Sequence, residues 1–135
     1  KVTGGKNVQV YGVCAFRNCK NLQSFSFGKI TKIQRFVFAG CSNLKSVNLP
    51  TTLKILGTGA FQDCKKLSKV KLPYSLHTVG KDVFAGCTAL KSISIPSKVT
   101  SIYESAIPEH TKITVKDKSE AAYVFITRPN LKVVK

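Results

Sequence analysis

The sequence is short of acidic residues, histidine and methionine, and each shortage narrows the range of possible functions. Its 135 residues include six Asp and Glu, two histidines and no methionine or tryptophan. No run of about 18 apolar residues occurs, so the sequence predicts no membrane span. Because an unprocessed natural chain begins with methionine and this one begins with Lys1, we expect a mature product or a piece of a longer protein.

The scarcity of histidine and of metal-ligand spacing argues against catalysis. Neither His77 nor His110 lies in a motif with a nucleophile and an orienting acid. We interpret His77 as an outward-facing surface residue and His110 as a hydrogen-bonded residue in a core position. The cysteines lack the Cys-x-x-Cys spacing of zinc sites, and no phosphate-binding glycine loop occurs. The sequence therefore predicts a protein that is not an enzyme and has no cofactor and no metal.

Positive charge, by contrast, is in large excess. Lysine and arginine number 22 against six acidic residues, which gives a formal net charge of +16. Residues 1–100 hold only two acids, Asp63 and Asp82, against 16 basic residues. A charge of this size attracts anionic partners and makes their association depend on salt. The alternative is a solvated surface whose charge mainly maintains solubility.

The most regular feature is an internal repeat of 22 or 23 residues. Each unit opens with Phe, followed by Cys three positions later, Leu six positions later and then two apolar residues on alternate positions. The opening residues are Phe16, Phe38, Phe61 and Phe84. Self-similarity at a fixed period of this length is the signature of a solenoid. A solenoid supplies a surface, so the expected function is binding.

Each unit divides into a strand and a turn. The stretch with alternating apolar residues predicts a half-buried strand. That strand ends at Pro50, Pro73 or Pro96 in the later units, because proline cannot donate to a strand ladder. A second short apolar pair follows, and then a Gly-x-x-Ala/Val-Phe turn for which we predict one or two helical turns.

The glycine of that turn is not invariant along the chain. Gly57 and Gly80 occupy the position in two units, and Gln34 and Tyr103 occupy it in two others. The position therefore does not strictly require a positive φ.

Four cysteines recur in one position of the repeat. Cys19, Cys41, Cys64 and Cys87 are expected to stack about 4.8 Å apart inside the solenoid, where a thiol behaves as a small buried hydrophobe. Side chains stacked in one direction do not suit the disulfide dihedral, so we predict four reduced, buried thiols. Cys14 lies outside this ladder and is the one candidate for a reactive thiol or an intermolecular bridge.

The repeat decays toward the end of the chain. Ile113 and Val115 predict one last strand, Ser119 is a possible N-cap of a short helix, and residues 130–134 predict an edge strand. We expect a single domain over residues 1–135. Its parts are a partial turn of a truncated repeat at 1–15, four repeats at 16–106 and a C-terminal cap at 107–135.

The motif F-x-x-C-x-x-L-x-x-[VI]-x-[LI]-P, continued by the second apolar pair and the Gly-x-x-[AV]-F turn, resembles the BspA-like (Treponema pallidum type) leucine-rich repeats over residues 8–107. The resemblance implies an α/β fold, a right-handed leucine-rich-repeat solenoid with a parallel β-sheet on one face and short helical turns on the other. It also implies an extracellular or cell-surface protein with a role in adhesion to host cells, matrix proteins or other microbes. The basic charge exceeds what the family leads us to expect.

Strand residues between the apolar ones are expected to face outward and to align in columns across the repeats. The middle of the sheet would then carry lysines among short polar side chains. The candidate binding residues are Lys45, Lys69, Lys71, Lys91, Ser24, Ser46, Asn48 and Ser92. Such a face suits a sulfated or carboxylated glycan, an acidic protein or phosphate. The alternative interpretation is that these residues are ordinary solvated sheet positions.

Three functions remain open at this point. The first is a recognition or adhesion module that binds a protein or anionic glycan of a host or neighbouring cell through its basic face. The second is a structural spacer or oligomerisation segment of a larger surface protein. The third is an intracellular nucleic-acid binder, which the predicted inward orientation of Phe25 and Phe27 disfavours because no aromatic side chain is left for base stacking.

Overall fold

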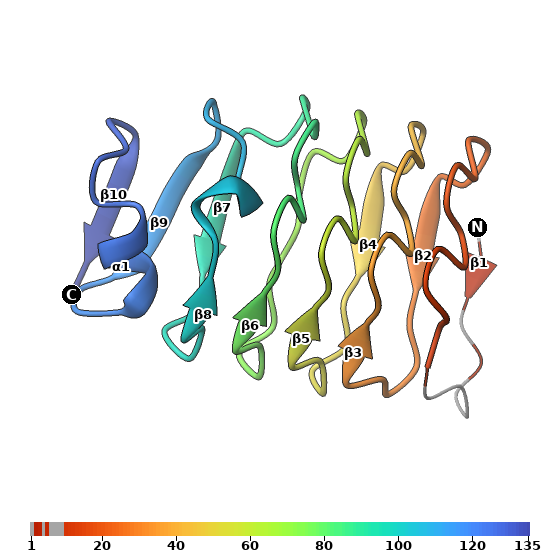
Figure 1. Cartoon of the computed structure of the whole chain (residues 1–135), viewed down its shortest axis with the longest axis horizontal. Helices are drawn as coiled ribbons and strands as arrows, with labels where there is room; N and C mark the ends of the chain where they lie inside the picture. The colour runs from red at the N-terminus through yellow and green to blue at the C-terminus, as the bar shows by residue number, and fades with distance from the viewer. Residues whose placement is uncertain (1, 4, 6–9) are drawn as a thin grey trace.

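The chain winds into a parallel-strand β-solenoid of about five turns (Figure 1). A computed structural model describes residues 2–3, 5 and 10–135. Its elements are β1 (Val2–Thr3), β2 (Ser24–Ser26), β3 (Lys32–Ile33), β4 (Ser46–Asn48), β5 (Ile55–Leu56), β6 (Thr78–Val79), β7 (Ser92–Ile95), β8 (Ser101–Ile102), the 3₁₀-helix η1 (Glu104–Ala106), β9 (Lys112–Lys116), α1 (Glu120–Val124) and β10 (Leu131–Val134). Of the predicted partial turn at 1–15, residues 1, 4 and 6–9 lie outside the described part.

The strands lie on two sides of the solenoid. On one side, the strands pair in the order β1-β2-β4 and, separately, β7-β9-β10. On the other side they pair in the order β3-β5-β6-β8. Every pair is parallel and in register with the repeat, as in the pairing of Phe25 with Val47 and of Ile55 with Thr78. The solenoid and its parallel sheet are therefore confirmed.

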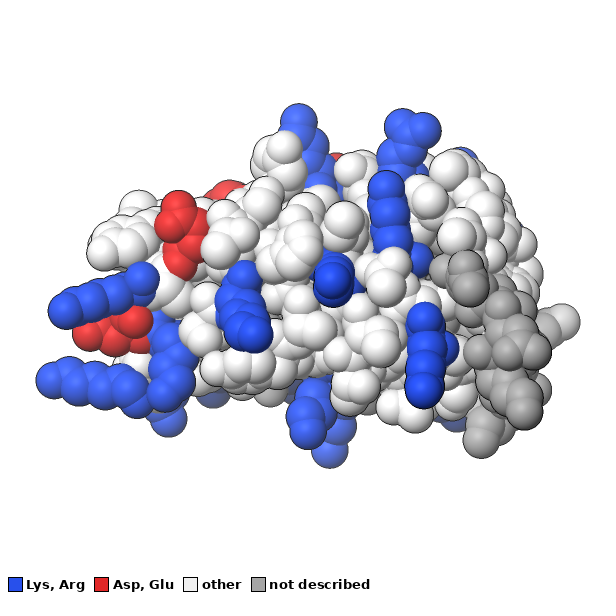
Figure 2. Space-filling model, turned by 90° about the horizontal axis from the view of Figure 1, so that it is seen from below, with Lys and Arg blue, Asp and Glu red and all other residues white. Residues whose placement is uncertain are grey.

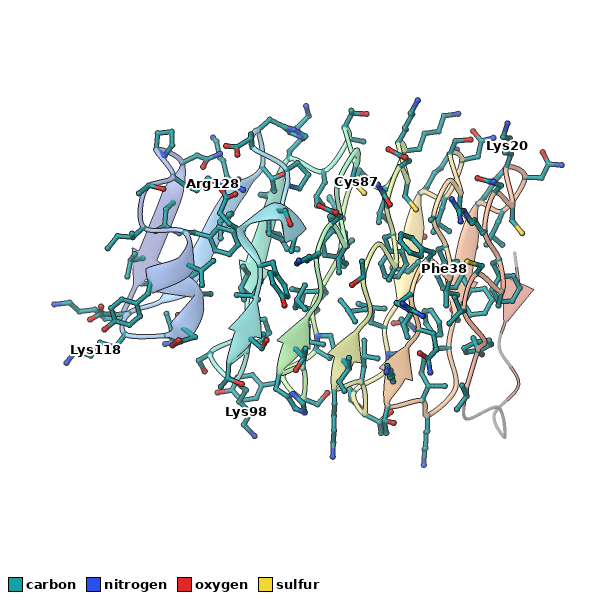
Figure 3. The ribbon with its side chains drawn as sticks, in the orientation of Figure 1. Lys20, Phe38, Cys87, Lys98, Lys118 and Arg128 are labelled. Atoms are coloured by element: carbon teal, nitrogen blue, oxygen red, sulfur yellow. The ribbon has the colours of Figure 1, made fainter. Side chains whose placement is uncertain are left out.

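The phenylalanines that open the repeats form the centre of the core. The rings of Phe16, Phe38, Phe61 and Phe84 stack with successive centroid separations of 5.4, 5.3 and 5.8 Å and nearly parallel planes. In Figure 3, Phe38 points into the interior, whereas Lys20 and Lys98 extend from opposite margins of the solenoid. Phe25 is also buried and packs against this stack, which confirms its predicted inward orientation. Phe27 is only half-buried.

The cysteine ladder ties neighbouring coils together. The thiols of Cys41, Cys64 and Cys87 each donate to the carbonyl oxygen of the opening Phe of the preceding coil, at 3.1–3.2 Å. All five cysteines are free. Cys19 was predicted to be buried but is half-buried, because no earlier member of the cysteine ladder lies beside it.

The turns after β3, β5 and β6 are not helical, which corrects the prediction of short helical turns there, whereas the corresponding turn after β8 contains η1. Residues with φ near +60°, such as Phe36, Gly59 and Asp63, recur at short intervals there, and an α-helix cannot accommodate them. Alternate N–H groups bond to the next coil instead of along the chain. Phe38 donates to Ala60, and Phe61 donates to Val83. In the described part of the chain, helix is confined to η1 and α1.

Gly57 is required by a close approach between coils. It has no positive φ, but a Cβ placed on it would lie 2.8 Å from the backbone N of Arg35 and 2.9 Å from the carbonyl oxygen of Ile33. Backbone atoms of a packed coil cannot give way as a flexible side chain would. We therefore expect Gly57→Ala to lower the free energy of unfolding by about 1–3 kcal/mol, the usual cost of overpacking, as measured by urea unfolding.

Gly12 provides a matched control because it occupies the same position of an earlier unit. Among the described residues, nothing lies within 4 Å of a Cβ placed on Gly12. Gly12→Ala should leave stability unchanged or raise it slightly, since alanine reduces the freedom of the unfolded chain. Equal losses in the two variants would contradict the close-approach explanation.

The elements after the last full repeat follow part of the sequence prediction. Ser119 is the N-cap of α1, with its side chain accepting a hydrogen bond from the N–H of Ala122 at 3.3 Å, and β10 pairs with β9 as an edge strand. The prediction for His110 was wrong, because this residue is exposed. The buried polar residue is its neighbour Thr111, whose hydroxyl donates to the carbonyl of Leu90 at 2.8 Å. That these elements act as a terminal cap stays a prediction.

Candidate functional site

The outward side chains of residues 23–26, 45–48, 68–71, 91–94 and 112–116, which include β2, β4, β9 and most of β7, form what we call the sheet face. The register of the strands aligns these side chains as predicted: Ser24 lies beside Ser46, and Ser26 beside Asn48. The same columns resume in Ser92 beside Lys112. Adjacent side chains on one face of a sheet stand about 5 Å apart, so a single ligand can contact several coils.

The eight predicted residues all belong to the sheet face. Lys45, Lys69, Lys71, Lys91, Ser46, Asn48 and Ser92 are exposed, and Ser24 is half-buried. They are spread over four coils. The structure shows that these residues lie on one face and are at least partly exposed to solvent. Their role in binding stays a prediction.

Sequence reasoning missed the continuation of this face into β9. Lys112 and Lys116 are exposed and Thr114 is half-buried, and Thr114 pairs directly with Ser94. The signal was available, because Ile113 and Val115 alternate with these three residues as in the other strands. The sheet face thus carries six exposed lysines rather than four.

Acidic residues are absent from the sheet face. Its strand segments, residues 23–26, 45–48, 68–71, 91–94 and 112–116, contain no Asp or Glu. The two acids of residues 1–100, Asp63 and Asp82, lie instead in turns with φ of +58° and +56°, a conformation that Asp tolerates better than most residues. Figure 2 shows, for the view from below, that basic groups spread along the solenoid while most visible acids gather toward its C-terminal end. The positive field of the sheet face is therefore not neutralised locally.

The sheet on this side is interrupted in the middle. Residues 68–72 follow the course of a strand, but among the described residues they make no backbone hydrogen bond to β4 or to β7. The side therefore consists of two three-stranded sheets flanking an unpaired segment. The sequence pattern of the repeat does not predict this interruption, because Val70 and Leu72 match the apolar positions of the paired strands.

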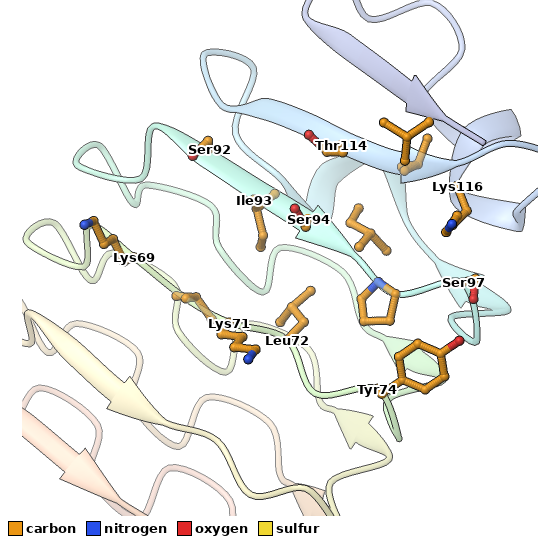
Figure 4. Close-up of a pocket in the computed structure, with 15 residues that line it drawn as sticks. Lys69, Lys71, Leu72, Tyr74, Ser92, Ile93, Ser94, Ser97, Thr114 and Lys116 are labelled. Carbon is orange, nitrogen blue, oxygen red and sulfur yellow. The ribbon is translucent and has the colours of Figure 1, made fainter.

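A hollow of about 660 Å³ opens next to this interruption (Figure 4). In Figure 4, Lys69 and Lys71 lie on one side of Ser94, and Thr114 and Lys116 lie on the other. The apolar part of its lining is made by the aliphatic side chains Val70, Leu72, Ile93, Ile95, Val115 and Val134, together with Pro96. Hollows of this volume are typical of ligand sites.

Tyr74 marks one end of the hollow. Its side chain lines the hollow and is 68% exposed, and the Lys98 ammonium lies 5.5 Å from its ring centroid. A cation over the ring face is attracted by the quadrupole of the aromatic system. Lys98 therefore adds a further positive charge beside the hollow.

The remaining candidates for chemistry are separate from one another. The side chain of His77 is half-buried, with Nδ1 2.9 Å from the hydroxyl of Thr78, and His110 is distant in sequence and exposed. Cys14 is half-buried, with its sulfur 4.0 Å from a guanidinium nitrogen of Arg17. In the described part of the chain, no three His, Cys, Asp or Glu residues come together as a metal site would require.

The buried thiols are protonated and unreactive at neutral pH. Burial raises the pKa of Cys41 to about 11 and the pKa of Cys87 to about 12, and it raises the pKa of Cys64 as well. The thiolate is the reactive form of cysteine. Because these groups stay protonated, they act as hydrogen-bond donors of the core.

The repeated coil, the parallel strands and the exposed face define a leucine-rich-repeat solenoid. A family model described as BspA type leucine-rich repeat region matches residues 1–117 in six copies. The chain belongs to this BspA-type leucine-rich repeat family. The sequence-based recognition is thereby confirmed.

Solved structures of similar proteins agree with this assignment. The leucine-rich repeat protein of Treponema pallidum is 29% identical, with a TM-score of 0.75 over 81% of this chain and 52% of its own. A leucine-rich repeat protein from Bacteroides ovatus is 28% identical, with a TM-score of 0.81 over 99% of this chain and 36% of its own. A leucine-rich cell surface protein from Faecalibacterium prausnitzii, at 24% identity, has a TM-score of 0.77 over 98% of this chain and 31% of its own. The chain thus spans about half or less of these proteins.

The comparisons point to no catalytic family. No curated protein matches the chain significantly. Over the described residues, none of the helices has the length and the apolar character needed to cross a bilayer.

Proposed function

We propose that the chain is a non-enzymatic recognition and adhesion module of a surface or secreted protein, and that it binds an anionic macromolecule through the sheet face. The observation that carries this proposal is the presence of six exposed lysines on a face without a single acidic residue. Mixed charges would have sufficed for solubility, whereas a face of one sign raises the rate of encounter with an oppositely charged partner.

The partner is a protein or an anionic glycan of a host or neighbouring cell, and the location is extracellular or at the cell surface. Membership of the BspA-type repeat family supports this, as does the printed description of the F. prausnitzii relative as a cell surface protein. Phe25 is inward and nearly inaccessible, so the sheet face offers few aromatic groups for stacking on bases. That favours a glycan or protein over single-stranded nucleic acid.

The test compares two charge reversals of equal size. The double variant K45E/K91E removes two lysines from the sheet face, and the double variant K32E/K54E removes two exposed lysines from the side of β3 and β5. We expect K45E/K91E to weaken binding to a heparin oligosaccharide at low salt by about tenfold or more, since charge complementarity at the contact is lost. K32E/K54E should weaken it by less than about threefold, through net charge alone.

Binding is to be measured by surface plasmon resonance at several salt concentrations, with an acidic protein and single-stranded DNA as further ligands. Equal losses in the two variants would show that net charge, and not the sheet face, governs binding. Absence of binding to every anion at low salt would remove the proposal.

A structural spacer or oligomerisation segment is the second candidate. The observation that favours it is that, among the described residues, β1 and β10 each pair with one strand only, so each offers an edge for another coil. Edges of this kind template pairing with a further strand. Self-association of the chain in the absence of anions, measured by analytical ultracentrifugation, would favour this second function.

A further inference from the structure

We infer that the hollow beside the interrupted sheet is a docking site for an extended acidic peptide that carries one bulky apolar side chain between carboxylates. The inference rests on the proposed function and names the class of partner. It is carried by two features found together, an apolar seat and a rim of lysines.

The apolar seat exists because the strand ladder is broken. In a paired sheet, hydrogen-bonded neighbours hide the inward side chains from the outer face. At residues 68–72 no such pairing is made, and the half-buried side chains Val70, Pro96 and Val134 contribute to the lining of a hollow open to the outside. Removing apolar surface of this kind from water is favourable, so the binding of an apolar ligand group in the hollow is favourable as well.

The shape of the hollow follows from residue size. The outward positions of β7 are Ser92 and Ser94, which are short, and both are exposed. Lys69 and Lys71 lie on one side of these serines (Figure 4). On the other side Thr114 pairs with Ser94, and Lys116 follows two residues farther along β9. A depression bordered by two rows of longer side chains accommodates an extended chain lying across β7.

The rim selects for negative charge. Lys69, Lys71 and Lys116 are all exposed and line the hollow, and no acidic residue does. A carboxylate placed on each side of the seat can therefore pair with an ammonium group. The serine and threonine hydroxyls of β7 and β9 can both donate and accept, as the amide groups of a peptide require.

The apolar seat favours a peptide over a sulfated glycan. A heparin-like saccharide carries charge on every sugar unit and has no bulky aliphatic group to bury. Such a ligand would satisfy the lysines but leave the aliphatic lining in water. An acidic peptide with a leucine or similar residue satisfies both features at once, and the buried side chain adds affinity in proportion to its apolar area.

The experiment uses two probe peptides of equal charge, acetyl-Asp-Glu-Leu-Asp-Glu-amide and acetyl-Asp-Glu-Ser-Asp-Glu-amide, with the full chain at low salt. Affinity is measured by calorimetric titration, and the contact region by amide chemical-shift changes in NMR spectra. We expect the leucine peptide to bind about tenfold more tightly than the serine peptide, which is the effect of largely burying one leucine side chain. Shifts should concentrate in residues 68–74, 92–97 and 114–116.

Two pairs of variants locate the site. Ser94→Phe fills the hollow without changing charge, and Ser46→Phe makes the same change at an exposed position of β4 outside it. Lys71→Gln and Lys45→Gln form the matching pair for charge. We expect Ser94→Phe to abolish the preference for the leucine peptide and Ser46→Phe to preserve it. Lys71→Gln should weaken the binding of both peptides more than Lys45→Gln does.

The outcomes separate this inference from the proposed function. If both peptides and a heparin hexasaccharide bind, but Ser94→Phe and Ser46→Phe behave alike, the docking site is overturned while the basic face stands. Heparin binding that Ser94→Phe alone abolishes would overturn the peptide assignment in favour of a saccharide. If neither the peptides nor heparin binds at low salt, the proposed function and the inference both fail.

Discussion

Replacement of Phe61 by alanine is expected to lower the free energy of unfolding by about 3–5 kcal/mol, the range for truncating a buried phenylalanine. Phe61 is fully buried, and its ring lies 5.3 Å from that of Phe38 and 5.8 Å from that of Phe84, with an interplanar angle of 4° to each. One truncation therefore weakens two interfaces between coils, and in a repeat protein those interfaces hold the array together. Urea unfolding followed by circular dichroism measures the loss.

Two further variants keep this prediction testable if Phe61→Ala does not fold. Phe61→Leu retains much of the side-chain volume and should lose clearly less stability than Phe61→Ala. Tyr123→Ala removes an aromatic ring that is 61% exposed on α1 and should change stability by no more than about 0.5 kcal/mol. A loss of similar size in Phe61→Ala and Tyr123→Ala would show that the ring stack does not stabilise the solenoid.

Replacement of Arg128 by methionine is expected to cost about 3 kcal/mol, because several charge-assisted hydrogen bonds are lost together. The side chain is 3% exposed. Its guanidinium donates to the carbonyl oxygens of Pro108 at 2.8 Å and Ile107 at 2.6 Å, and to both the carbonyl and the carboxylate of Glu104 at 3.1 and 2.9 Å. This one residue fastens the chain after α1 to the segment around η1.

Two controls separate the carbonyl contacts of Arg128 from its shorter ion pair, with Glu104. The Glu104 side chain is about half exposed, so the ion pair is screened by solvent. Glu104→Gln should therefore lose far less stability than Arg128→Met. Arg128→Lys should lose most of what Arg128→Met loses, because one ammonium cannot reproduce the planar fork of donors. Thermal unfolding of the three variants measures these losses of stability. A large loss of stability in Glu104→Gln alone would contradict the conclusion that the carbonyl contacts dominate.

The buried ladders were predictable because the sequence repeats them. A position that recurs every 22 or 23 residues returns to the same place in each coil, so Phe38 and Phe61 had to stack on one another and the cysteines had to align. The outward columns followed from the alternation of apolar and polar residues. For the same reason the lysines of the sheet face could be named as binding candidates before their placement was known.

The conformation of the turns was not predictable from the same pattern. A Gly-x-x-Ala/Val-Phe stretch suits a helical turn locally. In the solenoid, however, its alternate N–H groups bond to the carbonyls of the next coil, and this requires positive φ at residues such as Phe36 and Asp82. Contacts between coils override the local preference, and a single coil read by itself contains no information about them.

The hollow was likewise invisible in the sequence. The stretch from Ser68 to Leu72 has the same alternation as the strands that pair, and only its hydrogen bonding differs. Hydrogen bonding across coils depends on their spacing, which side chains throughout the core set together. The repeat pattern therefore predicted Lys69 and Lys71 as candidates, whereas only the three-dimensional structure revealed the apolar seat beside them.

The amino-acid sequence alone determined the class of fold, the inward ladders of phenylalanine, thiol and leucine, and the outward array of lysines, because each depends on periodicity along the chain. The tertiary structure alone decided which strands pair, where the sheet breaks and where partly buried apolar side chains line a hollow. Those properties depend on distances between neighbouring coils, and such distances result from the packing of many residues that are far apart in sequence.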